Sequence, residues 1–282
     1  MAGVSAQPGA LSVIAPGVGL AEQGVQSGRD AALGQVQLQH VAYKATAFAQ
    51  VRDVSLAEAA GRLIDGVVPI RQPMQYRGQW SKPGWYYFAY LEKHISYESR
   101  FEAAHLLLLD FAGGVRDVIP QPFRLHWRQG KAARRHTPDY LVERVSGSDL
   151  VLDVKGTARA ADPKNALVFD VTRLACMQMG LDYRVATDIR MTLLQNVQWL
   201  AGYKTPALLE GSTGTLIGQV THPVSCQEAA SRAARSLGTV VPLVLPTLFH
   251  LCWRRALSID LSEPFTGRTQ VGPAGLFPLV LT

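Results

Sequence analysis

The sequence predicts an α/β fold in which a mixed β-sheet is flanked by helices, followed by a mainly helical C-terminal domain. The first observation is a helical pattern over residues 96–113, where apolar side chains recur every three or four positions. The second is a set of three strand-like segments between residues 118 and 152, separated by turn-forming residues. The third is a helix, a strand and a helix over residues 163–202. This succession of helix, three strands, helix, strand and helix predicts the mixed sheet.

The first helix is expected to begin at Ser96, a good N-cap residue, and to end at the glycine pair of residues 113–114. Glu98, Glu102 and His105 then lie at positions i, i+4 and i+7, on one face of the helix. One glutamate would be able to face a metal ion from there. The alternative is that these residues form a solvated acidic stripe.

The three strands are expected at residues 118–125, 140–142 and 150–152. Residues 127–135 are expected to form a polar, basic turn after the first strand. The sequence Ser-Gly-Ser-Asp at residues 146–149 is a hairpin signal between the other two. The last two strands are therefore expected to be neighbours in the sheet.

The elements that follow have clear boundary signals. Asp162 is an N-cap followed by Pro163 at the first helical position, and Gly180 closes this helix. Residues 183–186 resemble another strand, and the apolar spacing of residues 189–202 indicates a further helix.

The last third of the chain is expected to be a separate, winged-helix-like module. Residues 227–237 and 240–256 are predicted to be helical, the second despite its prolines, and residues 257–271 to form a short hairpin. Two helices followed by a basic hairpin are typical of such a module. The arginines that would touch phosphate there are Arg254, Arg255 and Arg268. The alternative is that arginines near a helix C-terminus only stabilise the helix dipole.

Composition restricts the class of protein only broadly. With 282 residues, nearly half of them apolar, the chain is long enough to bury a sizeable core. The formal net charge of +6 favours a polyanionic partner. Three widely spaced cysteines, an uncharged N-terminal start and the lack of a long uninterrupted apolar segment predict a cytoplasmic protein without a disulfide framework.

The N-terminal residues have little periodic pattern. Residues 1–40 are rich in Gly, Ala, Gln and Ser and are expected to form a disordered arm. Residues 43–90 are aromatic, basic and interrupted by prolines, which is typical of short strands packed on the next domain. Their aromatic side chains either stack on bases or belong to the core.

The order and spacing of the acidic residues predict a metal-dependent nuclease site. Asp139 and Asp153 are expected in neighbouring strands, and Lys155 shares a strand face with Asp153 because side chains alternate. Carboxylate oxygens would hold Mg²⁺, with Mn²⁺ as a substitute, and the ion would activate a water for attack on a phosphodiester. Lysine would orient or deprotonate that water and stabilise charge on the phosphate. Glu102 is the expected third acid, and Glu98 is the second choice.

A basic stretch precedes this site. Residues 116–135 carry six basic residues against one acid, a density suited to contacts with a DNA backbone. The alternative is an exposed hairpin kept soluble by its charge. The candidate DNA-binding residues in this stretch are Arg124, Arg128, Lys131, Arg134 and Arg135.

Five segments, spread over residues 80–203, resemble the TnsA-like endonuclease subunits of heteromeric transposases. They are Tyr97-Glu98-Ser99-Arg100-Phe101-Glu102, Gln121-Pro122-Phe123, Arg135-His136-Thr137-Pro138-Asp139-Tyr140, Asp153-Val154-Lys155 and Asn196-Val197-Gln198-Trp199-Leu200-Ala201-Gly202-Tyr203. The C-terminal module is similar to the helical DNA-binding or partner-binding domain of that family. Many relatives have glutamine or glutamate where this chain has Asp153.

The resemblance implies a restriction-endonuclease-like, PD-(D/E)xK fold and cleavage of the 5′, non-transferred strands at the ends of a transposon. It assigns Glu102, Asp139 and Lys155 to the helix acid, the metal-binding aspartate and the lysine of that site. It also implies three kinds of partner: double-stranded transposon-end DNA, a DDE-type, TnsB-like recombinase and a TnsC-like ATPase regulator. The expected domains are an arm at residues 1–40, the endonuclease domain at 41–205 and the C-terminal domain at 206–282. Two alternatives stay open: a restriction- or resolvase-type nuclease of the same fold, and a DNA-binding scaffold without activity.

Overall fold

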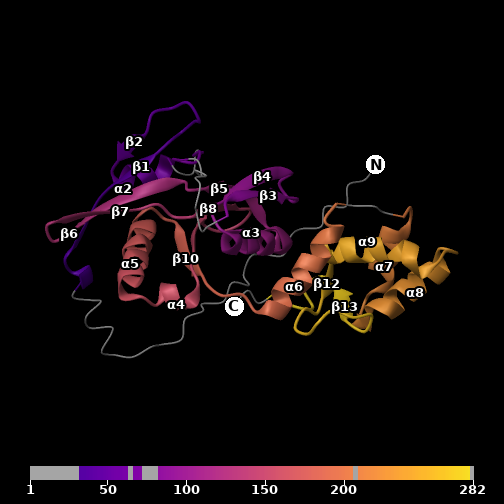
Figure 1. Cartoon of the computed structure of the whole chain (residues 1–282). Coiled ribbons are helices and arrows are strands. Elements are labelled where there is room, and N and C mark those ends of the chain that lie inside the picture. The colour runs from indigo at the N-terminus through magenta and orange to yellow at the C-terminus, as the bar shows by residue number, and fades with distance from the viewer. Residues whose placement is uncertain (1–31, 63–65, 72–81, 206–208, 280–282) are drawn as a thin grey trace.

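The computed structural model describes residues 32–62, 66–71, 82–205 and 209–279. It has a mixed α/β fold with several sheets, as expected from the sequence. Figure 1 shows that α7, α8 and α9 lie together at one end of the molecule, whereas β1, β6 and β7 lie at the other.

The central sheet has the strand order β10-β9-β8-β5. Its strands are β5 (Val115–Pro120), β8 (Tyr140–Arg144), β9 (Leu150–Val154) and β10 (Asp182–Ala186). Neighbours β5, β8 and β9 pair antiparallel, and β10 runs parallel to β9. The predicted mixed sheet and the pairing of its last two meander strands are thereby confirmed.

Helices cover both faces of this sheet. Side chains alternate along each strand, so successive residues pack against helices on opposite faces. Tyr140 and Leu152 face α3 (Arg100–Ala112), where they pack in one apolar cluster with Leu106 and Leu109. The residues next to them in the strands, Leu141 and Val151, belong to a second cluster with Val171 and Ala175 of α5 (Pro163–Gln178). The sheet is therefore buried on both sides.

The prediction that Ser96 caps the first helix is wrong. Ser96 lies in β4 (Lys93–Tyr97), where it pairs with Trp85 of β3 (Gly84–Phe88) and is held in an extended conformation. The N-cap of α3 is Ser99, whose hydroxyl accepts a hydrogen bond from the Glu102 N–H at 3.1 Å. Glu98 consequently precedes the helix instead of lying on its acidic face.

The single strand predicted at residues 118–125 is two strands in different sheets. Gln121 has a positive φ of 48° and separates β5 from β6 (Phe123–Gln129). The basic turn predicted at residues 127–135 is also wrong, because β6 and β7 (Ala132–His136) form a hairpin closed at Gly130. This hairpin leaves the central sheet and joins a second one of order β2-β1-β6-β7.

The second sheet includes residues assigned to the disordered arm. Strand β1 (Val36–Tyr43) pairs with β6 and with β2 (Arg52–Val54), so the predicted arm extends too far; residues 1–31 lie outside the described residues. Helix α2 (Leu56–Arg62) follows. Of the aromatic residues in β3, Phe88 is buried, whereas Trp85 is 66% exposed.

The boundary signals around α5 and β10 are confirmed. The Asp162 carboxylate accepts a hydrogen bond from the Lys164 N–H at 2.9 Å, and Gly180 has the positive φ of 71° that ends the helix. The short helix α4 (Thr157–Ala160) precedes α5, and α6 (Met191–Leu200) with the 3₁₀ turn η1 (Ala201–Tyr203) follows β10.

The C-terminal region contains the predicted pair of helices and the predicted hairpin. Its elements are α7 (Ser212–Gln219), β11 (Val224–Ser225), α8 (Cys226–Ser236), α9 (Val241–Trp253), β12 (Leu257–Ile259) and β13 (Gln270–Pro273). The three strands form a sheet of order β11-β13-β12.

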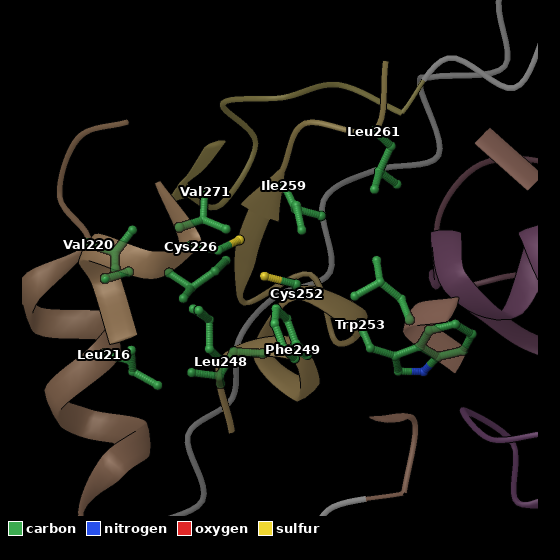
Figure 2. Packing of buried hydrophobic residues seen from close by; sticks show 14 of the residues in the cluster. Leu216, Val220, Cys226, Leu248, Phe249, Cys252, Trp253, Ile259, Leu261 and Val271 are labelled. Carbon is green, nitrogen blue, oxygen red and sulfur yellow. The ribbon is translucent and has the colours of Figure 1, made fainter. Parts of the chain in front are cut away.

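Figure 2 shows the apolar core of this region, with Cys226 and Cys252 near each other as free thiols. The same cluster includes Leu107 and Phe111 of α3 and residues of α6. Within the described residues, no single helix has the length and apolar composition to cross a membrane. Helices α8 and α9 have that length and composition only when they are counted together, and a bend of 120° separates them.

Candidate active site

The two predicted metal-binding aspartates lie next to each other at the end of a strand pair. Tyr140 pairs with Leu152 across β8 and β9, so Asp139, directly before β8, is brought opposite Asp153. The Asp139 N–H donates to Asp153 Oδ1 at 3.3 Å, and Asp139 Oδ2 accepts from the Val154 N–H at 2.7 Å. The expected proximity of these carboxylates is confirmed.

Negative charge is concentrated around Asp139. Burial raises the pKa of its carboxyl well above the usual value, and the charges of Asp153 and Glu102 raise it further. The Val154 N–H and the ammonium of Lys155 act in the opposite direction. A bound cation would relieve this repulsion, so the electrostatics favour one.

Asp153 is held by two side chains that the sequence analysis did not identify. Asp153 Oδ2 contacts His136 Nε2 at 2.9 Å and accepts a hydrogen bond from the Tyr183 hydroxyl at 2.6 Å. The Asp153 residue is 2% exposed. Burial and the charge of Asp153 raise the pKa of Tyr183, which keeps its hydroxyl protonated as a donor.

Partial signals for these two residues exist in the sequence. His136 is three residues before Asp139, and Tyr183 opens the strand expected at residues 183–186. Their convergence depends on where the β6–β7 hairpin lies relative to the central sheet and on the parallel pairing of β10 with β9, which joins residues far apart in the chain. No local pattern specifies that placement or that pairing.

Glu102 combines a structural role with its place near the site. Its carboxylate accepts hydrogen bonds from the Ser99 hydroxyl and from the Glu98 N–H, each at 2.8 Å, which forms a capping-box arrangement. The Tyr140 hydroxyl also donates to it at 3.3 Å. Burial raises the pKa of Glu102. Glu102 therefore approaches the aspartates from the α3 side of the sheet, while its oxygens are already hydrogen-bonded.

Glu98 is less suited to the site than the sequence suggested. It lies before the N-cap of α3, and its carboxylate pairs with Arg71 at 3.2 Å. Its carboxylate acts on the site only through its charge, which raises the pKa values of Glu102 and Tyr140.

Lys155 directly follows β9, where its N–H donates to the Ala186 carbonyl at 2.9 Å. Its charge lowers the pKa of Asp139, so the ammonium lies within electrostatic reach of that carboxyl. Among the described residues, no hydrogen bond or ion pair engages the Lys155 Nζ. This ammonium is therefore available to a phosphate.

His105 lies one turn after Glu102 on α3 and is buried. Burial lowers its pKa to about 4, so the ring is neutral at physiological pH. Its Nε2 is buried and has no partner among the described residues. The alternative of a solvated acidic stripe therefore does not hold at His105, which is neutral and buried.

The described residues contain no group of three or more His, Cys, Asp and Glu side chains arranged to hold a metal ion. Mg²⁺ usually binds proteins through one or two carboxylates and completes its shell with water and substrate phosphates. Asp139 and Asp153 fit that donor set, because they are adjacent and mutually repulsive, with Asp153 buried and Asp139 partly buried. Glu102 would contribute through water.

The C-terminal arginines differ in accessibility. Arg255 is partly buried: it donates to the Phe277 carbonyl at 3.3 Å, and its guanidinium lies 5.2 Å from the centre of the Phe111 ring. Its expected contact with DNA is therefore not supported. Arg254 is exposed and lies 5.3 Å from the centre of the Tyr90 ring. Arg268 is exposed in the loop before β13.

The site thus consists of two carboxylates and an ammonium where β8 begins and β9 ends, with a third acid on α3. No protein-family model and no curated protein matches this chain. The likeness to TnsA-like subunits rests on the sequence motifs.

Proposed function

We propose that this chain is a Mg²⁺-dependent DNA endonuclease subunit of a heteromeric cut-and-paste transposase, with Mn²⁺ as an alternative ion. It would cleave the 5′, non-transferred strands at the transposon ends. The observation that carries the proposal is the pairing of Asp139 with Asp153 beside the Lys155 ammonium, which no described side chain engages.

The element order supports a restriction-endonuclease-like fold for this chain. Helix α3, the antiparallel strands β5, β8 and β9, helix α5 and the parallel strand β10 follow one another, with the helices on opposite faces. The β6–β7 hairpin is an insertion between the first two strands of that core. The candidate residues lie at one end of the sheet, where a DNA backbone would reach them.

In the proposed mechanism, Asp139 and Asp153 would hold the divalent ion, and Glu102 would contribute through water. The bound ion would supply charge for the scissile phosphate and a lowered pKa for the attacking water. Lys155 would donate to a phosphate oxygen and orient that water. Hydrogen bonds from His136 and Tyr183 fix the Asp153 carboxylate, so little reorganisation is needed at this position.

The element order of the C-terminal region supports its assignment as a winged-helix-like module. One helix and one strand precede a helix pair and a two-stranded hairpin. In such modules the second helix of the pair reads DNA. That helix, α9, contains no Lys or Arg, and Leu243 on its surface is 53% exposed. These features favour contact with a partner protein. A TnsB-like recombinase and a TnsC-like ATPase are the partners the proposal requires.

One observation favours a second candidate, a DNA-binding scaffold without nuclease activity. The Asp153 carboxylate already has His136, Tyr183 and the Asp139 N–H as partners, and a buried acid satisfied in this way needs no metal. A restriction- or resolvase-type nuclease would share the same site but need no recombinase.

The decisive experiment incubates end-labelled transposon-end DNA with the chain and Mg²⁺, with and without the recombinase, and maps the cut strand. We expect cleavage of the 5′ strand that requires the recombinase. Lys155→Ala and Asp139→Ala should abolish cleavage while leaving DNA binding intact. Cleavage by either variant at the wild-type rate would refute the assignment, and efficient end-specific cleavage by the chain alone would favour the stand-alone nuclease.

A further inference from the structure

The β6–β7 hairpin carries its basic residues on two different faces. Side chains alternate along a strand, and residues paired across strands share a face. Leu125 and Trp127 of β6 are buried, and they pair with His136 and Arg134 of β7. Arg134 therefore lies on the face of the hairpin from which His136 reaches Asp153.

The opposite face, which we call the outer face, holds a connected row of cationic and titratable side chains. His126 pairs with Arg135 of β7 on one side and with His40 of β1 on the other. Arg124 and Arg128 are two residues either side of His126 in β6 and so share its face. The outer face is thus built by His40, Arg124, His126, Arg128 and Arg135, across three strands.

The histidines on this face are close together. The rings of His40 and His126 are stacked, with centroids 4.4 Å apart. Asp53 of β2 contacts His40 at 3.5 Å. In the part of the chain that the structure describes, no carboxylate pairs with Arg124, Arg128 or Arg135. The row therefore has an excess of positive charge that no described acid neutralises.

We propose that the outer face is a binding surface for the phosphate backbone of duplex DNA, separate from the face that carries Arg134 and the candidate active site. The proposal rests on the proposed function in taking DNA as the ligand, and adds His40 and His126 to the surface. Charge complementarity selects this occupant, because arginines without a described acidic partner, spaced along neighbouring strands, match a chain of phosphates. The outer face would hold DNA flanking the cleavage site, without touching the scissile phosphate.

Two neighbouring residues of β7 provide a matched test. Arg134 and Arg135 are both exposed and carry the same charge, but they lie on opposite faces. Binding of a short random-sequence duplex would be measured in EDTA, so that no cleavage occurs, over a series of salt concentrations. Each phosphate contact contributes about 0.9 to the slope of log K against log salt.

We expect Arg135→Ala to reduce the slope by about 0.9 and the variant Arg124→Ala/Arg128→Ala/Arg135→Ala by about 2.7. Arg134→Ala should leave it nearly unchanged. Thermal melting would verify that each variant is folded. Equal losses for Arg134→Ala and Arg135→Ala, or an unchanged slope in the triple variant, would overturn the proposal. Because the assay needs no cleavage, a negative result here is distinguishable from failure of the nuclease proposal.

The histidine pair gives an independent readout. Burial lowers the pKa of His126, and the neighbouring charges of His40, Arg124 and Arg135 lower it further, whereas Asp53 raises it. A bound phosphate stabilises the protonated His126 ring, so binding should tighten as pH falls from 8 to 6. Each proton taken up adds about one log unit of affinity per pH unit. His40→Gln/His126→Gln should remove that dependence, and an undiminished pH dependence would exclude the histidines from the surface.

Discussion

Replacing Asp139 with asparagine should show how much the charge of this residue lowers the free energy of unfolding, separately from its part in the function of the candidate site. Burial and the charges of Asp153 and Glu102 raise the pKa of the Asp139 carboxyl. Its pKa in the unfolded chain is about 3.9, so raising the pH above that value ionises the unfolded state first and destabilises the fold. The destabilisation is absent below about pH 3 and is complete above the folded pKa. It amounts to about 1.4 kcal/mol for each unit by which the pKa is raised.

The asparagine side chain would retain the main contact of the native aspartate. Asp139 Oδ2 accepts from the Val154 N–H at 2.7 Å, and an asparagine oxygen can accept the same bond without the charge. Losing the charged character of that bond costs about 1 kcal/mol. Asp139→Asn should therefore be more stable than the wild type in EDTA at pH 8, and the advantage should vanish at low pH.

Magnesium should reverse this ranking. A ligand present at about 100 times its Kd stabilises the folded state by about 2.7 kcal/mol, which corresponds to several degrees in Tm for a chain of this order. Thermal unfolding would be measured with EDTA and with Mg²⁺, at pH 5 and pH 8, with the 65% exposed Asp53 changed to Asn as the control. If Asp139→Asn is destabilised in EDTA and gains as much from Mg²⁺ as the wild type, Asp139 is neither repelled nor a metal ligand.

Three further predictions concern the other site residues. Lys155→Met should abolish cleavage without changing Mg²⁺-dependent stabilisation, because the ammonium is proposed to act on the phosphate and not on the ion; a lost Mg²⁺ effect in calorimetry would contradict this. Glu102→Gln should reduce cleavage far more than Glu98→Gln, and should lower stability by roughly 1 kcal/mol through the weakened capping box; the reverse ranking in matched cleavage and urea-unfolding assays would point to Glu98. Tyr183→Phe removes the donor at 2.6 Å from Asp153, so Mg²⁺ affinity in titration calorimetry should change while DNA binding does not; an unaltered affinity would limit Tyr183 to packing.

Local signals predicted the parts of the fold that depend on neighbouring residues. The pairing that joins Asp139 to Asp153 follows from two short strands and one turn, and α5 follows from Asp162 and Gly180. The true cap of α3 was also accessible, because Ser99 followed three residues later by Glu102 is a capping-box sequence.

Long-range pairing was not accessible in the same way. Gln121 adopts a left-handed conformation that is uncommon for residues other than glycine and asparagine. The prolines on either side of it, Pro120 and Pro122, were a local signal for the break between β5 and β6 that the prediction of a single strand did not use. The contacts of His136 and Tyr183 with Asp153 depend on strands that are 17 and 30 residues away from it. Side-chain convergence of this kind is fixed by sheet topology, which the alternation of apolar residues does not determine.

Helix α3 is shared between two apolar cores. Leu106 and Leu109 pack against the central sheet, whereas Leu107 and Phe111 belong to the core formed with the C-terminal helices. A chain truncated after residue 205 would expose that second face, so we expect this truncated chain to aggregate when produced alone. The same arrangement gives the C-terminal region a mechanical connection to the helix that carries Glu102. A partner that shifts α9 would therefore act through α3 on the free energy of arranging the site residues, without contacting the site itself.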